Sequence, residues 1–240
     1  MRISGLLGMV DALDVKLCRM GMLSSASWRQ VQSGRIRNLY AGRLSRSEPQ
    51  FGKFLGLTPY AASSHNICHD LQTVFPLEDN SVDIFQSQDV FEHIEYEKIL
   101  SVINEIYRII KPGGLFRLSL PDYRADLYWE RSVKDAGGNL LFDPGGGGAF
   151  VDGRVVGGGH LWFPDHENVQ ALFSASAFSE DRRARVDFLH YNRSDGRGVL
   201  ERIDYSKGYI KRTPDHDHRV TGSGQALSLV VDAVKGCPRF

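Results

Sequence analysis

The segment that most constrains the fold covers residues 82–121, where a helical pattern lies between two short apolar stretches. VDIFQS follows the turn sequence EDNS and has the length of a buried strand. EKILSVINEIYRIIKPGG then spaces its apolar residues as one face of a helix, which we expect Pro-Gly-Gly to end. LFRLSLP predicts the next strand. Strand, helix and strand in succession favour parallel pairing, so we predict an α/β fold with a doubly wound sheet.

Short apolar segments extend this pattern in both directions. IRNLYAG, KFLGL and HNICHDL precede it, and RVDFLHY and ALSLVVDAVK follow it, each bounded by turn residues. Residues 1–34 predict an N-terminal extension of one or two helices, and residues 35–240 the main domain. The ten glycines between residues 137 and 159 predict a long surface loop, because glycine is entropically costly to order.

Charge and composition exclude several classes of partner. Lys and Arg number 29 and Asp and Glu 29, so the net charge is zero and no nucleic-acid partner is expected. No apolar run approaches the roughly 20 residues that span a bilayer, and no secretory signal is evident, which predicts a cytoplasmic protein without a membrane span. Three widely spaced cysteines without a CxxC pair favour neither a disulfide framework nor a thiolate zinc site.

Three linked motifs point to a known family. They are HDLQTVFPLEDNSVDIFQSQDVFEHI, a helix ending in EIYRIIKPGG, and LFRLSLPD, in this order. With this order, residues 36–135 resemble class I S-adenosylmethionine-dependent methyltransferases of the methyltransferase type 11-like group, including relatives associated with glycan biosynthesis. The resemblance implies a seven-stranded, mostly parallel Rossmann-like sheet with helices on both faces and an antiparallel C-terminal strand. It also implies S-adenosyl-L-methionine as the cofactor.

The resemblance assigns a cofactor site at the carboxyl ends of the strands, where open parallel sheets bind ligands. It places an Asp-Leu pair beside the adenine, and a Gln-Asp pair near the sulfonium and the amino-acid tail. The usual glycine-rich loop is reduced to LYAGRLSR, and a threonine stands where an acid usually binds the ribose. The predicted cofactor-binding residues are Tyr40, Ala41, Gly42, Thr58, Asp70, Leu71, Gln88 and Asp89.

An acceptor hydroxyl must lose a proton during methyl transfer, so a general base is expected near the acceptor. Asp89, His93 and His160 are the predicted catalytic residues. Asp89 as a helix cap and His160 as a core histidine are the alternative interpretations. The predicted acceptor-binding residues are Asp122, Tyr123, Arg124, His160 and Trp162, with a helix cap as the alternative role of Asp122.

TPDHDHR gathers two aspartates and two histidines, but neighbours on an extended chain point to alternate sides, so we assign no metal and expect a solvated loop. The leading hypothesis is an O-methyltransferase acting on a sugar hydroxyl or similar small-molecule acceptor, with a quinone-like lipid precursor as second choice. The alternatives are a non-catalytic binding protein with a weakened cofactor site and a metal hydrolase built on TPDHDHR. Any self-association is expected to give a homodimer.

Overall fold

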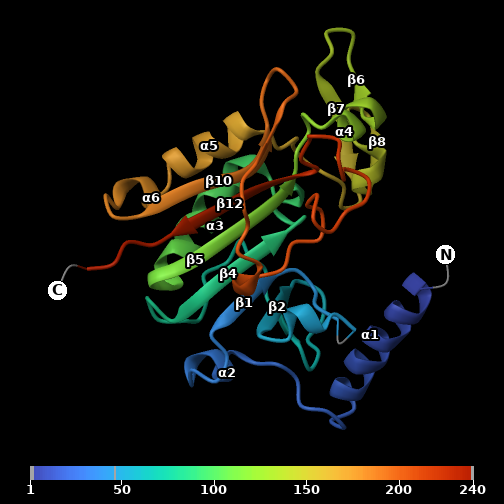
Figure 1. Cartoon of the computed structure of the whole chain (residues 1–240). Helices are drawn as coiled ribbons and strands as arrows, with labels where there is room; N and C mark the ends of the chain where they lie inside the picture. The colour runs from blue at the N-terminus through green and yellow to red at the C-terminus, as the bar shows by residue number, and fades with distance from the viewer. Residues whose placement is uncertain (1–2, 46, 239–240) are drawn as a thin grey trace.

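The computed structural model describes residues 3–45 and 47–238. Within these residues, eight strands form one sheet in the order β11-β10-β12-β5-β4-β1-β2-β3 (Figure 1). Strands β1 to β5 pair in parallel, whereas β12 runs antiparallel to both β5 and β10. The expected mostly parallel sheet with an antiparallel C-terminal strand is confirmed, and β11 adds an antiparallel edge strand. The strands are β1 (Asn38–Ala41), β2 (Phe54–Thr58), β3 (Asn66–Cys68), β4 (Val82–Gln88), β5 (Ile110–Pro121), β10 (Arg185–Asn192), β11 (Gly198–Leu200) and β12 (Ser228–Val234).

Three helices cover one face of the sheet: α3 (Tyr96–Ile109), α5 (His166–Ser174) and α6 (Ala177–Glu180) (Figure 1). The apolar stripe predicted for α3 is buried in the main core. The helix ends at Ile109, before Pro-Gly-Gly, which instead lies at the start of β5. The β4–β5 register shifts there, from Val82 opposite Ile110 to Ile84 opposite Leu115. This irregularity accommodates a proline, which a regular ladder excludes.

The segment 201–219 packs against the opposite face of the sheet. Tyr209 contacts Phe51 in an aromatic cluster that includes Tyr40 of β1. Arg117 of β5 is fully buried and donates to the carbonyl oxygens of Asp204 (2.9 Å) and Gly208 (2.7 Å), as well as to Asp232 of β12. The C-terminal part of the chain therefore reaches back across the strands.

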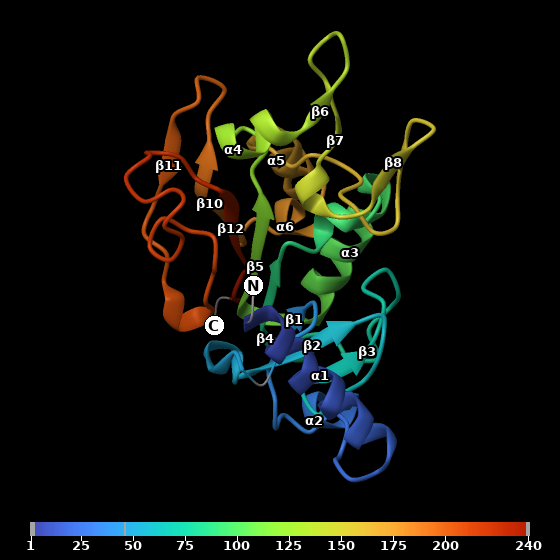
Figure 2. The same cartoon turned by 90° about the vertical axis from the view of Figure 1, so that its right-hand side faces the viewer.

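The glycine-rich stretch is not a single irregular loop. Two small hairpins form here. In the first, β6 (Val133–Lys134), just before the stretch, pairs with β7 (Leu140–Phe142). In the second, β8 (Ala149–Val151) pairs with β9 (Arg154–Val156). At Gly148 φ is +68°, and a Cβ would lie 2.4 Å from a backbone oxygen of the facing strand. Glycine is required there, so its role is close backbone approach. Figure 2 shows α4 (Asp126–Arg131) and these hairpins beyond the end of β5.

Two helices precede the sheet, as the sequence predicts: α1 (Ile3–Arg19) and α2 (Trp28–Gln32). The backbone N–H and the hydroxyl of Ser64 donate to Asp14 Oδ2 at 3.2 and 2.9 Å, which ties α1 to the chain before β3. The boundary near residue 34 stays a prediction. Among the described residues, no helix is long and apolar enough to cross a membrane.

Candidate active site at the ends of β4 and β5

The chain turns sharply at Asp89, directly after β4. Its φ of 52° lies in the left-handed region, which Asp tolerates better than most residues. A one-turn 3-10 helix, η2 (Phe91–His93), follows at once and has Val90 as its N-cap, so Asp89 does not cap it. The turn places Glu92 and His93 at the carboxyl edge of the sheet, as expected from the position of the motif.

A partly buried carboxylate, Asp89, and a fully buried one, Glu92, lie at this edge. Asp89 Oδ2 lies 3.3 Å from Arg212 Nη2, while Oδ1 has no hydrogen-bond partner within the described chain. Burial raises the pKa of Asp89, and Arg212 opposes that effect. Glu92 is fully buried, and both its carboxylate oxygens lack a hydrogen-bond partner within the same residues. Burial, with Asp89 adding to it, raises the pKa of Glu92 well above its usual range.

Two histidines complete the cluster. The rings of His93 and His160 meet edge to face with centroids 4.8 Å apart, and the His160 Nε2 atom lies 3.6 Å from Glu92 Oε1. The chain around His160 docks on η2, because Leu161 N donates to Glu92 O at 2.8 Å. Burial, with the nearby His93 adding to it, lowers the pKa of His160 to about 4. His160 is therefore neutral near pH 7.

A hydrogen-bonded network supports His160 from its other side. The Tyr123 hydroxyl donates to Asp143 Oδ2 at 2.5 Å and is also hydrogen-bonded to His160 Nδ1. Arg131 binds the same carboxylate through two bonds, of 2.7 and 2.5 Å. Burial raises the pKa of Asp143, but the bonds from Arg131 and Tyr123 outweigh it and the net shift is downward. Burial and Asp143 raise the pKa of Tyr123, which remains a phenol.

Of the residues predicted for catalysis and acceptor binding, four therefore lie in one cluster: Asp89, His93, Tyr123 and His160. Glu92 also lies in this cluster, although only its neighbours Asp89 and His93 were among the predicted site residues. Arg131, Asp143 and Arg212 were missed. Each comes from a distant segment, and no spacing in the sequence links those segments to η2.

The other predicted acceptor-binding residues have partners elsewhere. Asp122 is buried and accepts from Asn192 N (2.6 Å), Asn192 Nδ2 (3.0 Å) and Arg124 N (3.0 Å). It does not cap α4, whose N-cap is Ala125. Burial raises the pKa of Asp122 to about 7, and these hydrogen bonds counteract it. The Arg124 guanidinium pairs with Glu167 at 2.6 Å.

Trp162 lies in the main core rather than on an open surface. Its indole N–H donates to Phe91 O at 2.9 Å, and its ring packs against Tyr96. In this conformation the ring holds the chain after His160 against η2. It offers no free face for stacking on a substrate.

The loop after β1 folds onto β2 and β3. Gly42 has a φ of +111°, and its N–H donates to Leu57 O at 2.8 Å. Leu44 N donates to Asn66 Oδ1 at 2.7 Å. The Tyr40 ring packs against Phe51. These two backbone amides therefore already have protein acceptors, in contrast to the free amides of a glycine-rich ligand loop.

The remaining predicted cofactor residues differ in their accessibility. Ala41, Thr58 and Leu71 are buried. Gln88 is also buried, donating to Tyr209 O (2.9 Å) and accepting from Lys211 N (2.9 Å). Asp70 is exposed, and its Oδ1 accepts from Gln72 N at 3.0 Å. Asp70 is thus open to a ligand, while Gln88 is held by the segment 201–219.

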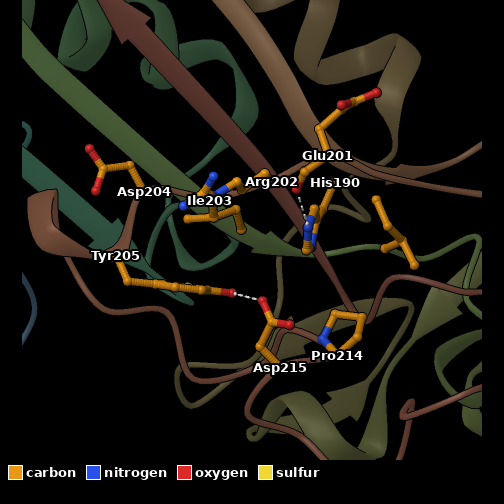
Figure 3. Close-up of a pocket in the computed structure, with 9 residues that line it drawn as sticks. His190, Glu201, Arg202, Ile203, Asp204, Tyr205, Pro214 and Asp215 are labelled. Carbon is orange, nitrogen blue, oxygen red and sulfur yellow. Dashed lines mark hydrogen bonds between the residues drawn. The ribbon is translucent and has the colours of Figure 1, made fainter.

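The TPDHDHR segment is an ordered loop whose side chains have separate partners. Asp215 accepts from the Tyr205 hydroxyl at 2.6 Å, His216 Nδ1 lies 2.8 Å from Ile210 O, and Asp217 pairs with Arg219. Asp215, Tyr205 and His190 of β10 line a cleft of about 1080 Å³. Figure 3 shows how these side chains lie around it. Within the described residues, the acidic and histidine side chains that converge on one point are Glu92, His93 and His160 instead.

The sheet order, with a cluster of acid and histidine side chains at its carboxyl edge, defines a mostly parallel α/β protein with a candidate active site after β4. Residues 53–118 match the family model described as a methyltransferase domain. The matched segment contains β2, β3, β4, η2, α3 and most of β5. The match supports a class I methyltransferase, and with it S-adenosylmethionine as the cofactor.

Among curated proteins, the chain is similar to a tRNA N(3)-cytidine methyltransferase of Gallus gallus, with 44% identity over 64 residues. The alignment covers 26% of this chain and 16% of that protein. Among solved structures, a SAM-dependent methyltransferase of Archaeoglobus fulgidus is 12% identical, with 93% of both chains covered and a TM-score of 0.47. A Burkholderia thailandensis 1,6-didemethyltoxoflavin-N1-methyltransferase, solved with S-adenosylhomocysteine, is 9% identical, with 98% of this chain and 91% of that chain covered and a TM-score of 0.46.

Proposed function

We propose that this chain is an S-adenosylmethionine-dependent methyltransferase that methylates a hydroxyl group of a saccharide or similar small molecule. The observation that carries the proposal is a cluster at the carboxyl end of β4, in which the buried Glu92 and the partly buried Asp89 and His93, all within the matched segment 53–118, meet the buried His160 from the later chain. A saccharide is favoured because the sequence motifs resemble those of glycan-associated relatives. Cytoplasmic location and a homodimer stay predictions.

The cofactor supplies an electrophilic methyl group. The acceptor oxygen forms the new bond to the methyl carbon, the electron pair of the sulfur–carbon bond goes to sulfur, and the hydroxyl proton must go to a base. His160 is neutral near pH 7 because burial lowers its pKa to about 4, so a ring nitrogen can accept that proton. Asp89 is the second candidate base, because its Oδ1 lacks a hydrogen-bond partner in the described structure.

The cofactor would lie along the carboxyl ends of β1, β3 and β4. Asp70 is exposed and follows β3. Glu95 is the main cause of the raised pKa of Lys98, in the first turn of α3, and Asp70 is close enough to that lysine to add to the effect. Helix α3 follows η2 almost directly, so Asp70 and the acid and histidine cluster flank the same end of that helix. Asp70 is suited to accept a hydrogen bond from the adenine amino group.

Calorimetry with S-adenosylmethionine and S-adenosylhomocysteine tests the proposal. Binding should weaken about tenfold to a hundredfold in Asp70→Ala, since a charge-assisted hydrogen bond is worth about 1.5 to 3 kcal/mol. Asp195→Ala is the matched control, because Asp195 is an exposed acid in the turn between β10 and β11 and should leave binding unchanged. The proposal fails if neither ligand binds the unmodified chain.

A non-catalytic protein of the same fold is the second candidate. It is favoured by the protein acceptors already bound to the amides of Gly42 and Leu44. Methyl transfer to a panel of sugars and small phenols, followed by mass spectrometry, separates the two functions. A methylated product that disappears in His160→Asn eliminates the non-catalytic candidate. Cofactor binding without turnover on any acceptor supports it.

A further inference from the structure

We propose that Glu92, His93 and His160 bind a divalent transition-metal ion, with Zn²⁺ as the expected ion. One potential ligand atom from each residue lies within 4.8 Å of the others. One carboxylate and two histidines are a ligand set typical of zinc and of non-haem iron sites. Three protein ligands leave a coordination position open for a further molecule.

Glu92 is the first reason to expect a cation. It is fully buried, and both of its carboxylate oxygens lack a hydrogen-bond partner among the described residues. An isolated ionised carboxylate is very costly to bury, and buried charges are ordinarily paired or bound to a metal. The preceding acid, Asp89, has Arg212 as a partner, whereas among the described residues Glu92 has only the neutral His160 ring within 4 Å as a basic group.

The orientation of His160 is the second reason. The proton of the Tyr123 hydroxyl points to Asp143 Oδ2, so the hydroxyl oxygen is left to accept from His160 Nδ1–H. This tautomer leaves Nε2 with a lone pair directed at Glu92 Oε1, 3.6 Å away. Two electron-rich atoms then face each other at a spacing too long for a hydrogen bond. It is close to the roughly 3.4 Å between neighbouring ligands of a tetrahedral ion with bonds of about 2.1 Å.

His93 is oriented in the same way. Its Nδ1 lies 3.1 Å from Gly159 O, and a carbonyl oxygen can only accept, so Nδ1 carries the proton. The Nε2 atom is then free to bind an ion. Each histidine thus has its Nδ1 fixed by an oxygen of the chain, which is the arrangement that usually orients metal-binding histidines.

The role of such an ion rests on the proposed function. In an O-methyltransferase, the open position would bind the acceptor hydroxyl and lower its pKa, as a bound cation does for coordinated water. With His160 Nε2 bound to the ion, Asp89 rather than His160 would take the acceptor proton. Metal binding itself requires neither the cofactor nor the acceptor, so it can be measured without either. A failure of methyl transfer and a failure of metal binding are therefore separate results.

The test uses the full chain, freed of metal with a chelator, in a background with Cys68→Ser and Cys237→Ser, because both cysteines are exposed. Titration calorimetry with Zn²⁺ alone should give one ion per chain. Glu92→Gln and His93→Asn should each weaken binding at least tenfold. His93 is only partly buried, so its variant should fold even if the Glu92 variant does not.

His218→Asn is the matched control, because His218 is exposed in the TPDHDHR segment and should bind no ion of this site. Zn²⁺ should also raise the melting temperature of the unmodified chain but not of Glu92→Gln or His93→Asn. The proposal is overturned by an absence of stoichiometric Zn²⁺ binding. It is equally overturned by binding that survives both ligand variants or disappears in the His218 variant.

Discussion

The Arg212 guanidinium lies 3.3 Å from the Asp89 carboxylate and joins the segment 201–219 to the end of β4. The adjacent Lys211 N–H donates to Gln88, the last residue of that strand. The consecutive residues Lys211 and Arg212 thus bind the consecutive residues Gln88 and Asp89 at the end of β4. The position of the segment 201–219 is therefore coupled to the charge at the candidate active site.

Replacing Arg212 should destabilise the fold by leaving the partly buried Asp89 carboxylate unpaired. We expect Arg212→Gln to lower the free energy of unfolding by about 1 to 3 kcal/mol, below the value for a fully buried pair because this side chain is 35% exposed. Urea unfolding near neutral pH measures the change. Arg197→Gln, which breaks an exposed pair with Asp195, should have little effect. If Asp89→Asn lowers the free energy of unfolding by the same amount in the Arg212→Gln variant as in the unmodified chain, Arg212 and Asp89 are not coupled.

Arg117 should be the more important anchor of the same segment. It is fully buried, forms a bidentate pair with Asp232 (2.7 and 2.6 Å) and donates to two backbone carbonyls. Arg117→Met leaves that acid and those carbonyls unpaired, so we expect a loss of about 3 to 5 kcal/mol. The exposed pair Arg185–Asp187 supplies the control, Arg185→Met. Chemical denaturation compares the two variants, and equal stability would contradict the anchoring role.

Asp122 should make the stability of the protein pH-dependent. Burial raises its pKa to about 7 in the folded protein, so the folded state holds the proton more tightly than the unfolded state. The contribution of Asp122 to the free energy of unfolding is fully present below about pH 4. This contribution falls by about 1.4 kcal/mol per pH unit as the pH rises to about 7, and above about pH 7 it no longer changes.

The measurement compares the unmodified chain with Asp122→Asn, which cannot titrate. The difference between their free energies of unfolding should fall between about pH 5 and about pH 7 and then level off. Other titrating groups cancel in this difference. A constant difference across that range would show that Asp122 does not carry the shift.

Asn66 should control the loop that follows β1. Its amide oxygen accepts from Leu44 N at 2.7 Å, and its amide nitrogen donates to Leu44 O (2.9 Å) and to the Ser63 hydroxyl (2.8 Å). Asn66→Ala should cost about 1 to 3 kcal/mol of stability, because buried groups lose their partners. If this loop weakens the cofactor site, the variant should also bind S-adenosylhomocysteine more tightly. Calorimetry and thermal unfolding measure the two effects, and Ser63→Ala, which keeps the Leu44 bonds, is the control.

Much of the fold follows from local patterns. The stripe on α3 and the apolar segments of β4, β5, β10 and β12 have periodicities that need no partner to recognise. The helix ends just before Pro-Gly-Gly, but β5 starts at Ile110 rather than at the predicted Leu115, because an irregular register accommodates Pro-Gly-Gly within the strand. The hairpins of the glycine-rich segment were also missed, since they depend on backbone contacts between strands of three residues or fewer.

The candidate site divides in the same way. An acid and a histidine after β4 at the carboxyl edge could be predicted without the structure, because the direction of the chain along each parallel strand fixes which edge its carboxyl end reaches. The addition of Arg131, Asp143 and Arg212 is visible only in the folded chain, because they come from segments far from η2 in the sequence. Burial and partner choice also exist only after folding. They are what separate the unpaired carboxylate of Glu92 from the well-bonded one of Asp122.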